Sequence, residues 1–417
     1  MPVQNSIALG LQHCLYLDTN SCVWSCGKNQ FGQLGQSNQV NKLTPTKIKT
    51  LPEIESVYCG TNQSFLLDVD GKVWSCGCND NGQLGHGTFT SLKEPVEIKN
   101  IPSIQDVLPC GVYTILLDRF GGVWMCKNAQ TKLPFPVGGT YLPPIQMVSG
   151  SAQHILLLDK NGDVWSCGNN SGGQLGTGDG KPKTEPVKIE TLSKIRHISA
   201  GMHHSIFINI QGEVYTCGRN DFGQLGVGDY NARLEPVKLQ HDYLPLIQTS
   251  FTSSTFTFFL DYDGGVWCCG RNEFGQLGLG DYRTRNIPTK LNIDFVQDID
   301  LSPSHALLLD IDGVVWSVGN NDYGQLGIGD FNKRNIPTAI QNLPQIQRIY
   351  CSDNYFSVLL DTQGGIWSFG RNSEGQLGLS DRKGRFHPTL ITSLPVIRSP
   401  YSGISIKNAR FESHHCN

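Results

Sequence analysis

The sequence predicts an all-β fold, a single closed β-propeller of four-stranded blades. A module of about 50 residues recurs along the 417-residue chain, and each copy carries one aromatic residue at the same place. Modules of this length are typical of solenoids, propellers and arrays. Each module predicts about four short strands and shows no helical period, which favours a propeller. The aromatic residues are Trp24, Trp74, Trp124, Trp165, Tyr215, Trp267, Trp316 and Trp367, at steps of 50, 50, 41, 50, 52, 49 and 51 residues.

The middle of each module predicts a β-hairpin. In the fifth copy an apolar run at residues 206–208 is followed by a turn at 209–212, and residues 213–217 run back. In most other copies the turn is Asp-x-x-Gly, where the aspartate accepts a bond from the backbone two residues on and the glycine takes positive φ. One or two carboxylates without a further run of ligands are too few for calcium. We therefore expect a plain turn.

The remaining parts of the module predict a buried strand, a second turn and an outer strand. In Val-Trp-Ser-Cys, the strand period of two places tryptophan and cysteine on one face and valine and serine on the other. Gly-Gln-Leu-Gly then turns the chain, with leucine as an apolar plug. The proline of the later Pro-x-x-Ile segment suits an outer strand, where no ladder hydrogen is required. The chain enters at the hairpin and ends with the outer segment, so we expect velcro closure, with strands from both termini completing one blade.

Composition argues against several classes of protein. Charged residues are 17% of the chain, which argues against a disordered protein. The formal net charge of −3 argues against a dedicated nucleic-acid binder. No stretch of about 18 apolar residues occurs, and no basic start leads into an apolar run, so we expect neither a membrane span nor a secretory signal. We expect an intracellular protein, cytoplasmic or nuclear, that is a monomer.

Cysteines and histidines recur at fixed places in the module, which indicates structural roles. Equivalent positions in successive modules generally lie beyond the roughly 7 Å limit for a disulfide, so we expect buried small side chains in a reducing compartment. The histidines stand five residues before the turn aspartate, or before Asn209, and we expect them to be structural hydrogen-bonding groups. A possible ligand fragment, His414-His415-Cys416, lies in the tail, but we expect no metal and no cofactor. The recurring residues are Cys26, Cys76, Cys126, Cys167, Cys217, Cys269, His13, His154, His204 and His305.

The motif Gly-x-Asn-x-x-Gly-Gln-Leu-Gly after an aromatic-bearing strand resembles the repeat of the regulator of chromosome condensation family. In that family a tyrosine is followed two residues on by Trp-Gly, whereas here tryptophan takes the first position and cysteine the second. The resemblance covers nearly all of residues 6–400 and implies a propeller with velcro closure. We place the propeller at residues 5–400 and a C-terminal tail at 401–417. Gly-Gln-Leu-Gly is intact at 32–35, 82–85, 173–176, 223–226, 275–278, 324–327 and 375–378.

The number of blades is open between eight and seven, because the family usually forms seven and this chain has eight hairpins. The third module, residues 108–146, lacks Gly-Gln-Leu-Gly and is about nine residues short. It keeps Asp118, Gly121, Trp124 and a Leu-Pro-Pro-Ile segment at 142–145, which is enough for a degenerate blade. We favour eight blades, with seven plus an irregular segment as the alternative.

The resemblance implies a protein that grips another macromolecule. Similar members include an exchange factor for the small GTPase Ran, propellers attached to ubiquitin ligases, an ultraviolet photoreceptor and inhibitor-like binders. We expect a non-enzymatic propeller that binds a protein through one loop-bearing face. The alternative is a guanine-nucleotide exchange factor for a small GTPase, although no long insertion supplies a wedge. We do not expect an enzyme, because repeats line a channel with similar residues and no nucleophile elbow, phosphate loop or zinc spacing occurs.

One repeated loop is the candidate binding surface. After Gly-Gln-Leu-Gly, four later modules carry an aspartate, then an aromatic residue in three of them, then basic residues. Equivalent loops of a propeller share one face, and an aromatic residue beside arginine is a favourable interface composition. We expect this arc to dock an acidic protein surface; the alternative is that its arginines pair with the neighbouring aspartates. The candidate residues are Tyr230, Arg233, Tyr282, Arg283, Arg285, Phe331, Lys333, Arg334, Arg382, Lys383 and Arg385.

The degenerate third module is a second candidate surface. Its segment Thr131-Lys132-Leu133-Pro134-Phe135-Pro136 breaks the pseudo-symmetry of the modules. A single partner often recognises such a break. The alternative is drift in a blade that tolerates loss.

Overall fold

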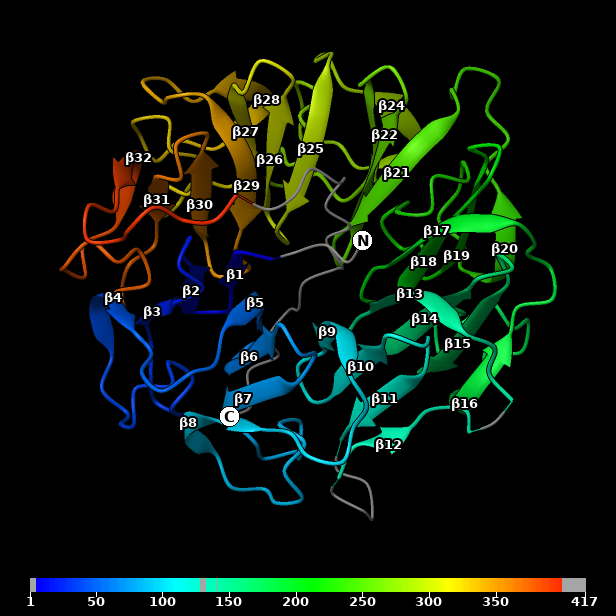
Figure 1. Ribbon diagram of the computed structural model, residues 1–417. Helices are drawn as coiled ribbons and strands as arrows, with labels where there is room; N and C mark the ends of the chain where they lie inside the picture. The colour runs from blue at the N-terminus through cyan, green and yellow to red at the C-terminus, as the bar shows by residue number, and fades with distance from the viewer. Residues whose placement is uncertain (1–4, 128–132, 140, 400–417) are drawn as a thin grey trace. The chain divides into compact units, whose positions relative to one another are not determined.

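The computed structural model describes residues 5–127, 133–139 and 141–399, and the regular elements in these ranges are all strands. They form eight four-stranded antiparallel sheets, the blades of a β-propeller, and each sheet uses four strands consecutive in the chain (Figure 1). The favoured count of eight blades is therefore confirmed. Within the described ranges, no helix has the length and apolarity to cross a bilayer.

The sheets fall into two compact units, each with four blades. The first unit takes up the described parts of Met1–Pro136, Asn321–Phe331 and Ile340–Ser405. Its strands are β1 (Ile7–Leu9), β2 (His13–Leu17), β3 (Val23–Gly27), β4 (Lys42–Lys47), β5 (Ile54–Cys59), β6 (Gln63–Asp68), β7 (Val73–Gly77), β8 (Leu92–Glu97), β9 (Ile104–Pro109), β10 (Thr114–Asp118), β11 (Val123–Cys126), β12 (Phe135–Pro136), β29 (Ile346–Cys351), β30 (Phe356–Asp361), β31 (Ile366–Gly370) and β32 (Arg385–Leu390).

The second unit takes up Val137–Asn320 and Asn332–Ala339 among the described residues. Its strands are β13 (Ile145–Gly150), β14 (His154–Asp159), β15 (Val164–Gly168), β16 (Lys183–Lys188), β17 (Ile195–Ala200), β18 (His204–Asn209), β19 (Val214–Gly218), β20 (Arg233–Lys238), β21 (Ile247–Thr252), β22 (Phe256–Asp261), β23 (Val266–Gly270), β24 (Arg285–Lys290), β25 (Val296–Leu301), β26 (His305–Asp310), β27 (Val315–Gly319) and β28 (Arg334–Ala339).

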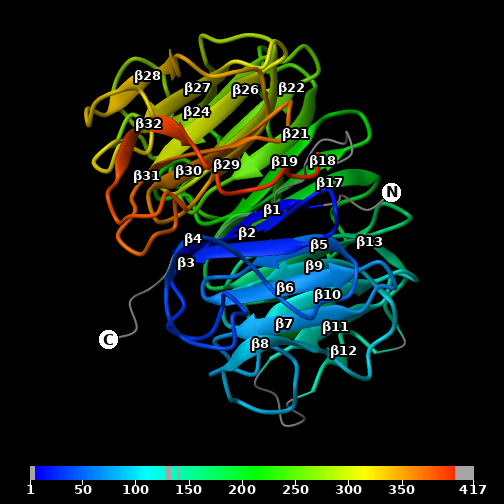
Figure 2. The ribbon, with the colours of Figure 1, turned by 60° about the vertical axis from the view of Figure 1, so that its left-hand side comes forward.

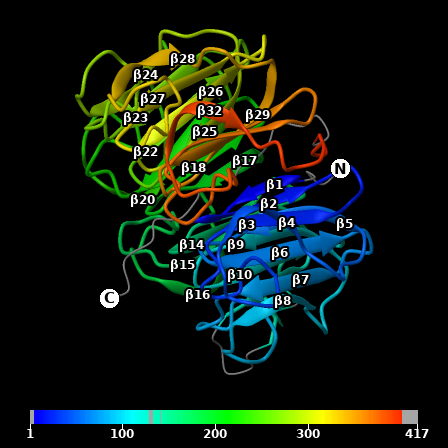
Figure 3. The same cartoon turned by 90° about the vertical axis from the view of Figure 1, so that its left-hand side faces the viewer.

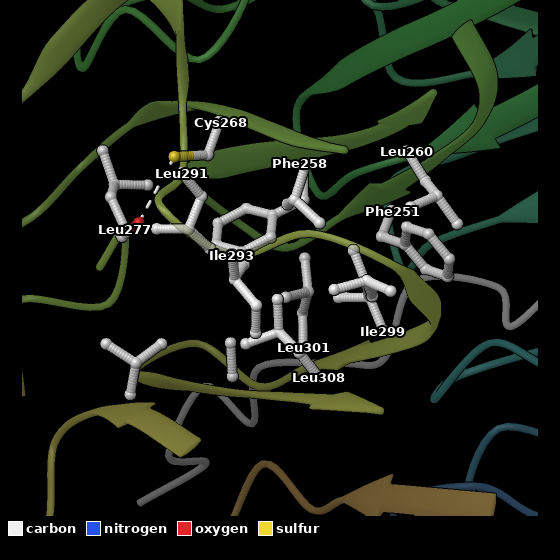
Figure 4. Packing of buried hydrophobic residues seen from close by; sticks show 14 of the residues in the cluster. Phe251, Phe258, Leu260, Cys268, Leu277, Leu291, Ile293, Ile299, Leu301 and Leu308 are labelled. Atoms are coloured by element: carbon white, nitrogen blue, oxygen red, sulfur yellow. Dashed lines mark hydrogen bonds between the residues drawn. The ribbon is translucent and has the colours of Figure 1, made fainter. Parts of the chain in front are cut away.

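The core lies between successive sheets, as the strand period predicts. Val214 shares a buried cluster with Trp267 and Cys269 of the following sheet, so the valine face of one blade meets the aromatic and cysteine face of the next. Figure 4 shows a similar cluster, in which Phe258 packs near Ile299 from the following sheet. Both faces of each inner strand are therefore apolar, which explains why the strands do not alternate between polar and apolar residues.

The turn aspartate does more than close the hairpin. Asp261 Oδ1 accepts bonds from the backbone of Asp263 and Gly265, as the Asp-x-x-Gly pattern predicts. Its Oδ2 accepts a bond of 3.1 Å from the indole Nε1 of Trp267, a contact that the sequence analysis missed. In the fifth module Asn209 and Tyr215 stand in these places. The aspartate–tryptophan pairs are 18/24, 68/74, 118/124, 159/165, 261/267, 310/316 and 361/367.

The Gly-Gln-Leu-Gly turn of the fifth module ties its sheet to the next one. Gly223 takes a φ of 75° and lies against the start of β24, where a Cβ would come within 2.5 Å of the Asn286 backbone. Gly226 lies under Pro288 of the same strand, and Gly228 N donates to Asn286 O at 2.8 Å. The leucines of the seven turns are buried, as predicted. This turn therefore holds the loop that follows it against the outer strand of the next blade.

The two ends of the chain meet inside the first unit. β29–β32 lie beside β1–β4 (Figure 1). Ser380 N donates to Leu43 O at 2.9 Å, which is the equivalent of the bond from Gly228 N to Asn286 O between two internal blades. Asp18 forms an isolated bridge with Ile397. We expected strands from both ends to complete one blade. In the structure β1–β4 all come from the N-terminal end, and among the described residues the C-terminal segment adds this bridge and two backbone bonds, from Thr19 N to Val396 O at 3.2 Å and from Arg398 N to Leu17 O at 3.0 Å. Figure 2 shows β5–β8 beside β9–β12, and Figure 3 shows β1–β3 beside β5–β7.

The recurring histidines and cysteines are structural groups, as expected. His204 Nε2 lies 3.0 Å from Thr257 Oγ1 of the next sheet, and Thr257 donates its single proton to Gln224 O at 2.9 Å. The histidine must then donate from Nε2, so the neutral ring carries its proton there. The described cysteines are free thiols, mostly buried, and burial raises the pKa of Cys76 to about 12. His154 and His13 repeat the histidine contact with Ser205 and Ser64.

Candidate partner-binding surface

The loops that follow Gly-Gln-Leu-Gly are built by an asparagine, an aspartate and an arginine. In the sixth blade Asn272 Oδ1 accepts a bond from Leu277 N at 2.9 Å, and its Nδ2 donates to the carbonyl groups of Asp281 and Arg283 at 3.1 Å. Asp281 Oδ1 then accepts a bond from Arg283 N, and Oδ2 accepts one of 2.8 Å from Arg285. These bonds fix the backbone from 281 to 285, so the loop presents its remaining side chains from a rigid support.

Three of the candidate arginines are paired inside their own loops. Asp229 accepts a bond from Arg233 and Asp381 accepts one from Arg385, at 2.7 and 2.9 Å. The bond from the arginine is the main cause that lowers the pKa of Asp229, Asp281 and Asp381. A fourth arginine, Arg334, donates to the backbone carbonyl oxygen of Asn332 in its own loop at 2.9 Å. These arginines follow the alternative of internal pairing, so they are less available to a partner than their charge suggests.

The remaining candidates of the second unit form an exposed aromatic and cationic group. Lys333 Nζ lies 4.3 Å from the centroid of the Tyr282 ring, although the two residues come from successive loops. Tyr282 is 44% exposed, and Arg283 and Lys333 are exposed beside it. We call Tyr282, Arg283 and Lys333 the Tyr282–Lys333 surface. Tyr230 is exposed on the preceding loop.

Two isoleucines near this surface are exposed and were not among the candidates predicted from the sequence. Ile336 is exposed on β28 and lies 4.0 Å from the place where a Cβ of Gly280 would stand, two residues before Tyr282. Ile287 has the same relation to Gly228 and is also exposed. The sequence Asn-Ile-Pro-Thr could have predicted these exposed side chains, because its isoleucine stands beside proline on an outer strand, which no further strand of its sheet covers.

The first unit contains the other candidates. The ring of Phe331 lies 5.4 Å from that of Phe386, which in turn lies 4.9 Å from His387. Arg382 and Lys383 are exposed in the loop before β32. Phe386 directly follows a candidate residue, but it lies outside the sequence pattern of the candidate loops, in which the aromatic residue precedes the basic ones.

The third module is present as a short blade, as predicted. Its outer strand β12 is only two residues long, and Leu133 packs against Gly87 of the second module. Thr131 and Lys132 of the proposed recognition segment lie outside the described residues, as do His414, His415 and Cys416. Over the ranges that the structure describes, no group of three or more histidine, cysteine, aspartate or glutamate side chains is arranged to hold a metal ion.

Comparison with known families finds one repeat along most of the chain. The regulator of chromosome condensation (RCC1) repeat matches residues 20–67, 70–114, 161–208, 211–260, 263–309, 312–359 and 363–400. A second model of the same repeat matches 5–33, 54–83, 145–174 and 195–224. Both leave residues 115–144 unmatched, in agreement with the degenerate third module. No curated protein matches the chain.

Solved structures with the same fold share less than a quarter of the sequence. Prp20p from Saccharomyces cerevisiae, described with its binding to Gsp1p and histones, is 22% identical with a TM-score of 0.64, over 81% of this chain and 91% of that one. Human WBSCR16 is 23% identical with a TM-score of 0.62, over 89% and 94%. Yeast RCC1 (Prp20) bound to Kap60 is 21% identical with a TM-score of 0.60, over 91% and 85%. At this identity the likeness shows the fold alone.

Proposed function

Because the chain belongs to the regulator of chromosome condensation (RCC1) repeat family, we propose that it is a non-enzymatic β-propeller that binds a protein through its Gly-Gln-Leu-Gly loops. The observation that carries this proposal is the Tyr282–Lys333 surface, an exposed aromatic ring under a lysine and beside a second cation. Tyrosine and arginine are enriched among the residues that dominate binding energies at interfaces. The two cations favour a partner with an acidic surface.

The rigid support of the loop strengthens the proposal. Ordering a mobile loop on binding costs free energy, and a preorganised loop avoids that cost. The hydrogen bonds that the side chains of Asn272, Asp281 and Arg285 form hold the loop in one conformation before any partner binds. The paired arginines therefore act as internal clamps, and the exposed residues between them make the contact.

The relatives support a protein as the partner. Prp20p is described as binding Gsp1p and histones, and yeast RCC1 is described in complex with Kap60. We propose by analogy that this chain also binds a protein, in the cytoplasm or the nucleus. Nucleic acid is a poor candidate for a direct ligand, because the chain has a net charge of −3.

Exchange of the three exposed residues is expected to weaken binding strongly. The partner is first identified by affinity purification of the wild-type chain and mass spectrometry, and its affinity is then measured with purified components. The variant Tyr282→Ala/Arg283→Glu/Lys333→Glu should bind at least about 30-fold more weakly, because a central interface residue contributes about 2 kcal/mol or more. Arg285 is left intact because its loss would release the loop.

A matched control changes one tyrosine and two cations in the same unit. Tyr262→Ala/Lys160→Glu/Lys194→Glu changes three exposed residues in the turns at the other ends of the strands. This control is expected to bind like the wild type. Undiminished affinity of the Tyr282 variant, or an equal loss in the control, would contradict the proposal.

A guanine-nucleotide exchange factor is the second candidate, favoured by the likeness to Prp20p and its binding to Gsp1p. Exchange requires that the propeller remodel the nucleotide pocket of a small GTPase. Release of a fluorescent nucleotide from a panel of small GTPases separates the two functions. If the wild-type chain accelerates nucleotide release, nucleotide exchange is its function. If the release rates are unchanged, protein binding without exchange is its function.

A further inference from the structure

Cys14 of the first blade stands at a place where four other blades have a serine or threonine opposite a cysteine. In the pairing of β2 with β3, Cys14 lies directly opposite Cys26. Among the eight pairs that the described strands form at this place, it is the only one with two cysteines. The four comparable pairs are Ser64–Cys76, Thr114–Cys126, Ser205–Cys217 and Thr257–Cys269.

The two thiols point at one backbone oxygen atom of the last blade. Cys14 Sγ donates to Gln376 O at 3.3 Å, and Cys26 Sγ donates to the same atom at 3.7 Å. In the fifth blade a serine hydroxyl and a cysteine thiol share Gln174 O in the same way. The thiol of Cys14 therefore replaces the hydroxyl in this contact, and both sulfur atoms lie beside one carbonyl group.

The separation of opposite residues in a sheet suits a disulfide of moderate strain. Opposite residues of antiparallel strands have Cα atoms about 4.5 or 5.5 Å apart, within the range of about 4.4–6.8 Å that disulfides span. Their Cβ atoms are about 4.5–5.5 Å apart, against about 3.5–4.5 Å in a disulfide. A bond between Cys14 and Cys26 therefore requires the two strands to move slightly closer. Strained disulfides of this kind are the labile ones, which thiols reduce readily.

Both sulfur atoms are buried, so an oxidant reaches them through local opening of the structure. The hydrogen bond with Cys14, and then burial, raise the pKa of the Cys26 thiol, which slows its reaction in the closed form. The last and first sheets come from opposite ends of the chain, and no short chain segment links them. We therefore expect this joint to open more readily than the others, and the pair to respond to sustained exposure to an oxidant.

We propose that Cys14 and Cys26 are a redox-sensitive pair, which hydrogen peroxide converts to a disulfide that loosens the joint between the last and first blades. Once the sulfur atoms are bonded to each other, neither can donate a hydrogen bond. The buried carbonyl group of Gln376 then loses both of its thiol donors. The pair shares no residue with the Tyr282–Lys333 surface, so failure of one proposal leaves the other standing.

The oxidation consumes one peroxide molecule for each disulfide. One thiol loses its proton, and its thiolate attacks a peroxide oxygen, so that the O–O bond breaks and a sulfenic acid and a hydroxide ion form. The hydroxide takes up the released proton as water. The second thiol attacks the sulfenic sulfur, an S–S bond forms and a second water molecule leaves. The sulfur atoms lose two electrons and the peroxide oxygen atoms gain them, and reduced glutathione reverses the step by thiol–disulfide exchange.

Mapping of disulfides after incubation of the full chain with hydrogen peroxide tests the chemistry. Chymotrypsin cuts after Tyr16 and Trp24, so mass spectrometry can distinguish Cys14, Cys22 and Cys26. We expect one intramolecular bond between Cys14 and Cys26, which excess reduced glutathione removes. The matched control Cys14→Ser copies the serine of the second and fifth blades and should form no such bond.

Amide hydrogen exchange tests the effect on the joint. Ser380 N donates to Leu43 O across it, and Gly228 N makes the equivalent bond to Asn286 O between the fifth and sixth blades. Oxidation should speed the exchange of the Ser380 amide at least about tenfold, since the joint loses two hydrogen bonds, and should leave the Gly228 amide unchanged. In Cys14→Ser, peroxide should change neither rate.

Three results would overturn the proposal. The first is the absence of a disulfide after prolonged exposure to peroxide, and the second is a bond from Cys26 to Cys59 in place of Cys14. The third is an unchanged exchange rate of the Ser380 amide in the oxidised chain, or an equal rise in Cys14→Ser.

Discussion

Lowering the pH from 7 to 4 is expected to unfold the protein, because the four recurring histidines are buried and stay neutral in the folded state. Burial lowers the pKa of His13 and His305 to about 4 and that of His154 and His204 to about 3, from an ordinary value of 6.5. Below pH 6.5 the unfolded chain therefore binds protons that the folded chain does not. The contribution of these residues to stability is complete above pH 6.5 and is lost as the pH falls towards 4.

The size of this effect makes it the largest that we expect. Each such histidine costs about 1.4 kcal/mol per pH unit in this window, so four cost about 5 kcal/mol per unit. The total stability of a folded domain is only about 5–15 kcal/mol. Far-ultraviolet circular dichroism against pH should thus show loss of the β-sheet signal above pH 4.

The chain itself suggests the control variant for the acid transition. Gln63 stands at the same module position as the histidines and donates from Nε2 to Gly111 O at 3.4 Å. Replacing all four histidines by glutamine should keep a donor there and move the unfolding midpoint at least one pH unit lower. A midpoint that does not move would show that other groups cause the acid transition.

Replacing Trp267 by alanine is expected to lower the free energy of unfolding by about 3–5 kcal/mol, the usual cost of removing a large buried aromatic side chain. Trp267 is 9% exposed and packs against Ile206 and Val214 of the preceding sheet. The exchange also removes the indole bond to Asp261 and the stacking on Tyr243 at 5.9 Å. The shift of the urea or guanidinium midpoint measures this loss.

A double variant separates the loss of volume from the loss of the hydrogen bond. The fifth blade contains Asn209 and Tyr215 where the sixth contains Asp261 and Trp267. Asp261→Asn/Trp267→Tyr copies that natural pair and should lose less than half of the stability lost by Trp267→Ala. An equal loss in both variants would contradict the packing described for this position.

The architecture could be predicted because it repeats. Eight copies of one pattern average out local ambiguity, so the valine face, the cysteine face and the buried leucine of Gly-Gln-Leu-Gly were all predicted correctly. The bond that the Trp267 indole donates to Asp261 was not, because it depends on how a twisted hairpin brings together two side chains six residues apart. At the closure, a bridge and backbone bonds join the C-terminal segment to the first blade, in keeping with the expected contact between the two ends.

The candidate surface was harder to predict than the fold. Sequence alone could not decide whether Arg285 faces a partner or Asp281, because both outcomes use the same residues at the same spacing. The stacking of Tyr323 on Tyr355 joins residues 32 positions apart, so the pattern within one module does not predict it.

Hydroxyl-radical footprinting of the chain, free and bound to its purified partner, tests most directly whether the Gly-Gln-Leu-Gly loops bind that partner. Tyr282 and Tyr262 are a matched pair, 44% and 56% exposed in the same unit and at opposite ends of the strands. We predict that binding protects Tyr282 from oxidation and leaves Tyr262 unchanged. Protection of Tyr262 with Tyr282 still fully reactive would contradict the account.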